Sequence, residues 1–153
     1  MTKPKKSLSA TSFARLAGVQ GLYEIEISGN SSDTILLDFL PQRWARIHEE
    51  VEGLQKPDKS KFSSLIRGVG MEKNDLDKII TAAIDKERQF ERLDVLLKSI
   101  LRAGTFELLR ESNVPLAVVI DEYVKITHAF YSENMPAFVN GVLDKIGKTL
   151  RSS

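Results

Sequence analysis

The chain has 153 residues, of which 42% are hydrophobic and 28% charged, and its formal net charge is +1. These values are typical of one soluble globular domain and exclude a fibrous or intrinsically disordered chain. The sequence contains no cysteine, which excludes a disulfide scaffold and a catalytic thiol. It also has no signal-peptide pattern and no apolar run near the roughly 20 residues that span a bilayer, so we expect a cytoplasmic protein without a membrane segment.

Residues 1–10 form a basic arm in this interpretation. Lys3, Lys5 and Lys6 place three positive charges within the first six residues. Exposed ammonium groups displace counterions from nucleic acid, so these lysines are candidate phosphate contacts in RNA. The alternative is a solvated, flexible terminus without a ligand.

The first predicted helix begins at Thr11 or Ser12, either of which can cap it, and ends near Ile27. Its small residues recur at helical spacing, which predicts close approach of another helix or of a second copy of the chain, and we favour an internal helix pair. These residues are Ala14, Ala17, Gly18 and Gly21.

Residues 28–33 then read as a loop, with Asp33 as the cap of a helix that begins near Thr34. Pro41 interrupts the apolar run of this helix, and a short second segment spans residues 44–54. Pro57 and Asp58 open one long helix, either straight or kinked, that extends to about residue 84.

The second half repeats the helical pattern. A charged surface connection at residues 85–92 leads to a strongly apolar helix over residues 93–109. The next helix takes Pro115 as its first residue and ends near Phe130, and the last is capped by Ser132 or Asn134. No segment shows convincing two-residue alternation, so the predicted fold is all-α, a compact bundle of about six to seven helices.

The sequence lacks the usual signs of catalysis. His48 and His128 are far apart, and neither has a second ligand at metal-binding spacing. The adjacent carboxylates of Asp121 and Glu122 point about 100° apart on a helix and do not converge. With no phosphate-binding glycine loop either, we expect no catalytic residue, no metal and no cofactor.

Two segments resemble the bacterial transcription antitermination factor family NusB. They are ARLAGVQGLYEIEISG at residues 14–29 and ELLRESNVPLAVVIDEYVKITHAFYSENMPAFVNGVLDKI at residues 107–146, of which FVNGVLDK is the most specific part. The resemblance implies two packed helical subdomains within one domain, here residues 11–88 and 89–153.

The resemblance also implies partners: boxA RNA of ribosomal RNA leaders, the small-subunit ribosomal protein NusE, and the RNA polymerase antitermination complex. Thr11, Ser12 and Phe13 stand where many relatives carry arginines, which is a departure from the family. By the resemblance, the RNA-binding candidates besides the lysines are Arg15, Gln20, Tyr23, Phe130, Asn134 and Phe138.

Each aromatic candidate, Tyr131 included, can instead belong to the core, and Asn134 can simply cap a helix. Glu91, Lys98 and Glu107 are the candidates for the protein-partner surface. The leading hypothesis is a non-catalytic RNA and NusE adaptor. A protein-only helical adaptor is the alternative, and the oligomeric state, monomer or homodimer, is left open.

Overall fold

The computed structural model describes residues 9–38, 58–85, 87–132 and 134–151. Within these ranges the regular secondary structure is helical throughout, as predicted. It comprises six α-helices and one 3-10 turn: α1 (Ala10–Ser28), α2 (Ser32–Asp38), α4 (Lys59–Ala83), η2 (Phe90–Arg92), α5 (Val95–Arg110), α6 (Leu116–Phe130) and α7 (Asn134–Leu150).

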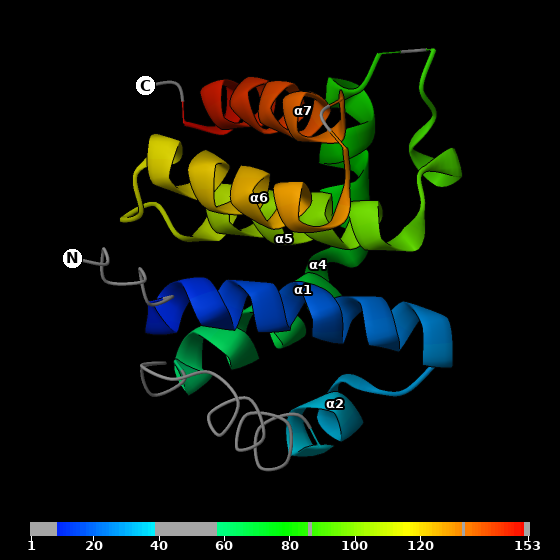
Figure 1. The fold of residues 1–153 in the computed structure, drawn as a ribbon, viewed down its shortest axis with the longest axis vertical. Helices are drawn as coiled ribbons and strands as arrows, with labels where there is room; N and C mark the ends of the chain where they lie inside the picture. Colours follow the sequence, from blue (N-terminus) through cyan, green and yellow to red (C-terminus); the bar gives the residue numbers. More distant parts are fainter. Residues whose placement is uncertain (1–8, 39–57, 86, 133, 152–153) are drawn as a thin grey trace, which may run out of the picture.

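The helices stack in crossed layers (Figure 1). α1 lies beneath α5 and α6, α7 lies above them, and α4 runs from the level of α2 up to α7. Buried apolar side chains from all six α-helices form one contiguous hydrophobic core. The two predicted subdomains, residues 11–88 and 89–153, therefore share this core. The boundary between them stays a prediction.

The small-residue stripe of α1 packs inside the molecule, as we favoured. A Cβ atom added to Gly18 would lie 2.9 Å from Leu65 Cδ1, and one added to Gly21 would lie 2.8 Å from Ile66 Cδ1. Because both leucine and isoleucine belong to α4, the stripe lets α1 and α4 approach closely. Gly29 ends α1 with a positive φ of 74°, a conformation that glycine adopts without steric cost.

Several helix ends differ from the predictions by one to three residues. Ser9, rather than Thr11 or Ser12, caps α1, because its side chain accepts a hydrogen bond from the Ser12 backbone N–H. Ser31, rather than Asp33, caps α2 by accepting a hydrogen bond from the Thr34 backbone N–H.

In the second half, Pro115 is the N-cap of α6 and Asn134 is already the first residue of α7. The charged connection contains η2, whose Phe90 is buried. The predictions for residues 39–57, including the break at Pro41 and the helical segment with Trp44, lie outside the described residues. Along the described ranges, no helix combines the length and the apolar character needed to cross a membrane.

Candidate nucleic-acid interface

Two aromatic side chains are exposed, one on α1 and one at the end of α6. Tyr23 lies in the second half of α1 and is 38% exposed, and Phe130 is the last residue of α6 and is 43% exposed. A large aromatic ring left in water loses the stabilisation that burial would give it. Exposed rings are also the platforms on which single-stranded RNA bases stack.

Tyr131 follows Phe130 and ties the turn between α6 and α7 to the start of α5. Its hydroxyl donates a hydrogen bond to Asp94 Oδ1, and Asp94 also caps α5 by accepting from the Leu97 backbone N–H. Burial, together with this hydrogen bond, raises the pKa of Tyr131 above its usual range. Tyr23 is close enough to contribute to the same shift, so the two tyrosines share one neighbourhood.

Phe138 lies one turn into α7, where it is half-buried and packs against the core. The Arg88 guanidinium carbon lies 4.7 Å from the centroid of its ring. Gln20 is half-buried on α1 and Asn134 is exposed at the start of α7. The structure thus leaves Tyr23, Phe130 and Asn134 accessible, whereas Phe138 is half-buried and carries Arg88 over its ring.

Arg15 is buried, with 4% of its surface exposed, although we predicted an RNA contact. Its guanidinium donates two hydrogen bonds to the carboxylate of Glu107, a residue that we had assigned to the partner surface and that is fully buried. Lys61 and Tyr123 donate to the same carboxylate. Neither Arg15 nor Glu107 therefore lies on a surface that RNA or protein can reach in this structure.

The polar side chains at the start of α1 form hydrogen bonds with other residues of the chain. Ser12 Oγ donates to Glu122 Oε1 at 2.8 Å, Thr11 Oγ1 donates to Asp58 Oδ2 at 3.4 Å, and Phe13 is buried. Lys3, Lys5 and Lys6 precede them and lie outside the described residues.

A groove of about 500 Å³ lies between the second half of α4, η2 and the first half of α5. Glu91 and Lys98, the other two partner candidates, both line it, with Glu91 exposed and Lys98 half-buried. The Lys98 ammonium lies 5.5 Å and the Arg102 guanidinium 5.4 Å from the centroid of the Phe90 ring. This groove thus combines an aromatic floor with charged walls.

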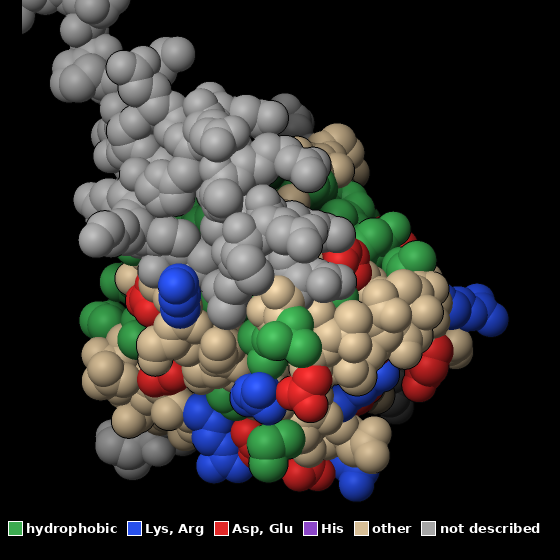
Figure 2. Space-filling view, turned by 90° about the horizontal axis from the view of Figure 1, so that it is seen from below, with side chains coloured by type: hydrophobic (Ala, Val, Ile, Leu, Met, Phe, Trp, Pro, Cys, Tyr) green, Lys and Arg blue, Asp and Glu red, His purple; other side chains and the backbone are tan. Residues whose placement is uncertain are grey.

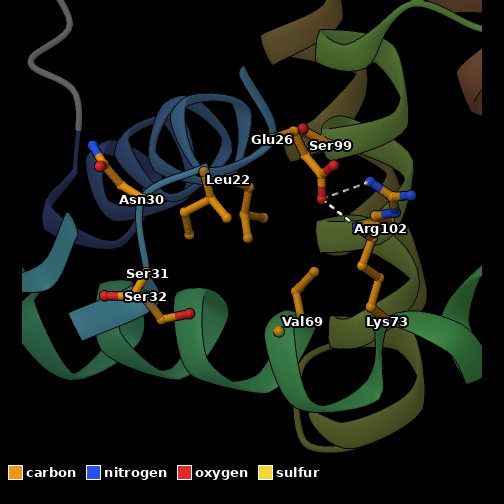
Figure 3. Close-up of a pocket in the computed structure, with 11 residues that line it drawn as sticks. Leu22, Glu26, Asn30, Ser31, Ser32, Val69, Lys73, Ser99 and Arg102 are labelled. Carbon is orange, nitrogen blue, oxygen red and sulfur yellow. Dashed lines mark hydrogen bonds and ion pairs between the residues drawn. The ribbon is translucent and has the colours of Figure 1, made fainter. Parts of the chain in front are cut away.

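A smaller cavity of about 260 Å³ lies beside the same arginine, between α1, the turn after it, α4 and α5 (Figure 3). Glu26 lies at its edge and pairs with both Lys73 and Arg102. Arg102 also donates to Asp77 at 2.7 and 3.0 Å. Because each cation already faces a carboxylate, this cavity is best described as an ionic junction of α1, α4 and α5.

Sequence reasoning missed Arg88, Asp94 and Arg102. Each acquires its importance from a ring or a carboxylate on another helix, so a linear pattern carries little signal for it. The sequence offered one hint, which was the position of Arg88 in the charged connection just before the apolar helix of residues 93–109. Among the described residues, no group of three or more His, Asp or Glu side chains could hold a metal ion.

This chain is similar to known proteins over nearly its whole length. The model of the NusB family matches residues 12–148. The transcription antitermination protein NusB of Rhizobium rhizogenes is 39% identical over 151 residues, which cover 97% of this chain and 92% of the relative. That of Sinorhizobium fredii is 40% identical with the same coverage.

A solved structure of T. maritima NusB superimposes with a TM-score of 0.74 at 30% identity. The superposition covers 97% of this chain and 93% of that one. The family match spans both resembling segments and the helices between them. The chain belongs to the NusB family.

Proposed function

We propose that the protein is a non-catalytic adaptor in transcription antitermination that binds boxA-type RNA together with NusE. The family match over residues 12–148 is the observation that carries this proposal. The relatives from Rhizobium rhizogenes and Sinorhizobium fredii are named transcription antitermination proteins. The accessible rings of Tyr23 and Phe130 support an RNA role, because stacking on aromatic faces is the usual way of holding unpaired bases.

The basic arm supplies the backbone contacts in this proposal. Arg15 is the one basic residue within α1, and it is buried against Glu107. Lys3, Lys5 and Lys6 therefore take over the electrostatic part, as point charges rather than as bidentate guanidinium groups. On the face that Figure 2 shows, the coloured acidic and basic side chains are interspersed, so that face does not favour a polyanion.

NusE occupies the groove beside Phe90 in this proposal. Glu91 and Lys98 offer charges of both signs around an aromatic floor, which suits a protein surface better than a nucleic acid. Glu91→Lys should slow association with NusE and change its salt dependence. Asp75→Lys, which makes the same charge change at an exposed position of α4, is the matched control. Equal association rates for both variants would remove this groove from the proposal.

The RNA part is tested by fluorescence anisotropy with labelled boxA RNA and with a scrambled RNA of equal length, each with and without NusE. The expected result is tighter binding to boxA, and a larger preference when NusE is present. Equal affinity for both RNAs in both conditions would overturn the RNA proposal. The protein-only adaptor, which the buried Arg15 and the internal bonds of Thr11 and Ser12 favour, would then be the better assignment.

A further inference from the structure

Arg88 and Phe138 form a cation–π pair that joins two segments 50 positions apart. The guanidinium carbon of Arg88 lies 4.7 Å from the ring centroid of Phe138, within the range of a cation–π contact. Arg88 is exposed, whereas Phe138 is half-buried and packs against the core. The arginine therefore forms the solvent side of the pair.

Local structure holds Arg88 in place. Its backbone N–H donates to the Asp85 carbonyl at 2.9 Å, which closes a turn directly after α4. Phe90 then anchors the connection in the core, and Asp94 binds the hydroxyl of Tyr131. The connection between α4 and α5 thus contacts the region around the α6–α7 turn at two points, through Phe138 and through Tyr131.

This geometry changes the role that can be given to Phe138. Phe138 is half-buried against the core and the Arg88 guanidinium lies over its ring, so Arg88 occupies the place that a stacked base would need on that ring face while the pair persists. The guanidinium is itself planar and stacks on nucleobases as aromatic rings do. Because Arg88 is exposed, its guanidinium is the planar group of this pair that RNA can reach.

We propose that Arg88 is a base-stacking residue for single-stranded RNA, with the ring of Phe138 as its rigid support. The inference rests on the proposed RNA function and names one contact within it. It assigns to Phe138 an indirect part, since the ring fixes the plane of the guanidinium and leaves its outer face for a base. The exposed ring of Phe130, at the end of α6, is a platform for another base in this proposal.

The test compares Arg88→Ala and Arg88→Lys with the parent by anisotropy with boxA RNA over a range of salt concentrations. Arg92→Ala is the matched control, because Arg92 is an exposed arginine of the same connection. Loss of one stacked base should weaken binding by about tenfold to a hundredfold in Arg88→Ala. Arg88→Lys should keep the charge and the salt slope but not the affinity, because an ammonium has no plane to stack.

A second readout separates stacking from a structural effect. Single abasic substitutions along the RNA should include one position that weakens binding to the parent and to Arg92→Ala but leaves binding to Arg88→Ala unchanged. Full rescue by lysine, or equal affinity of Arg88→Ala and the parent, would overturn the stacking role. A parent that shows no preference for boxA, with or without NusE, would instead overturn the proposed function itself.

Discussion

Arg15 of α1 and Glu107 of α5 form a two-pronged ion pair in the interior. Arg15 Nε donates to Glu107 Oε2 at 2.9 Å, and Arg15 Nη2 donates to Oε1 at 3.0 Å. Lys61 of α4 and Tyr123 of α6 donate to the same carboxylate, so one buried anion joins four helices. The pair therefore helps to fix the orientation of α1, which carries Tyr23.

Glu107→Gln should strongly destabilise the fold. It would remove the anion that Arg15 and Lys61 share and leave Arg15 only its longer contact with Glu122 at 3.7 Å. Breaking a buried pair on one side costs about 3–5 kcal/mol. Urea unfolding measures the change in the free energy of unfolding. Glu72→Gln is the control, because it removes the partner of Arg110 at the surface and should change stability little. Equal losses in both variants would show that the buried network adds nothing beyond a surface pair.

The same network predicts how stability depends on pH at the acid end. Burial alone would raise the pKa of Glu107. The hydrogen bonds and the positive charge of Arg15, together with the hydrogen bonds from Lys61 and Tyr123, instead hold this pKa below the ordinary value of 4.5. A depressed folded-state pKa contributes stability above the unfolded-state value, and this contribution is lost as the pH falls through the folded-state value. The stability difference between the parent and Glu107→Gln should therefore shrink below about pH 4.5. Parallel curves of unfolding free energy against pH would contradict this expectation.

At alkaline pH, Tyr123 should make the stability of the fold decrease as the pH rises. Burial, and next the charge of Glu107, raise the pKa of Tyr123 well above its ordinary value of 10.0. A phenol with a raised folded-state pKa contributes stability below the unfolded-state value and loses it as the pH rises. Tyr123→Phe should therefore flatten the loss of stability above pH 10. Melting temperatures across that range test it, and an unchanged slope would speak against the assignment.

The helices could be predicted from the sequence because the apolar residues keep the helical period in nearly every segment. The long helix through Gly68 and Gly70 is continuous for this reason, even though its middle has weak helix propensity. Cap positions were less predictable, because several serines and threonines stand near each helix start. Ser9 and Ser31 both precede the residues that we had chosen.

The candidate site could be predicted only in part, for a different physical reason. Periodicity cannot show whether a charged residue faces solvent or a buried partner, and the partner of Arg15 is 92 positions away. Family resemblance placed Arg15 and Glu107 on two different surfaces, whereas they bind each other. Phe138 was recognised as an aromatic candidate, but its cover by Arg88 depends on a contact between distant segments.

Gly68→Ala should destabilise the protein by about 1–3 kcal/mol through overpacking. The ring of Phe106 from α5 lies directly on the backbone of α4, and a Cβ at position 68 would come within 2.2 Å of Phe106 Cζ. Gly141→Ala is the matched control, because no atom lies within 4 Å of its added Cβ. Alanine at that exposed helical position should stabilise by about 0.5–1 kcal/mol. Thermal unfolding measures the change in melting temperature of both variants. Changes of the same sign would refute this packing.

Arg151 should stabilise the end of α5 from the far end of the chain. Its guanidinium donates to the carbonyls of Leu108 at 3.1 Å and Glu111 at 2.8 Å, and it also binds the Val114 carbonyl. Arg151→Ala should lower the free energy of unfolding by about 1–3 kcal/mol, since the carbonyls lose a charged donor at a helix C-terminus. Arg151→Lys should restore only part of this, because an ammonium cannot reproduce the fork. Lys148→Ala, an exposed charge change three residues earlier, is the control, and an equal effect would argue against the cap.

The basic arm and the exposed rings should affect RNA binding in different ways. Phosphate contacts strengthen binding to every sequence, whereas contacts with bases create preference among sequences. Replacing Lys3, Lys5 and Lys6 by alanine should weaken boxA and scrambled RNA alike and reduce the salt slope by up to about one per lysine in contact. Phe130→Ala should instead lower the preference for boxA by about 1–3 kcal/mol with little change in salt slope. Because Phe130 is 43% exposed, the variant should keep its helicity, which circular dichroism verifies. If a folded Phe130→Ala variant discriminates between the RNAs as the parent does, the ring is not a platform and the preference must arise elsewhere on the surface.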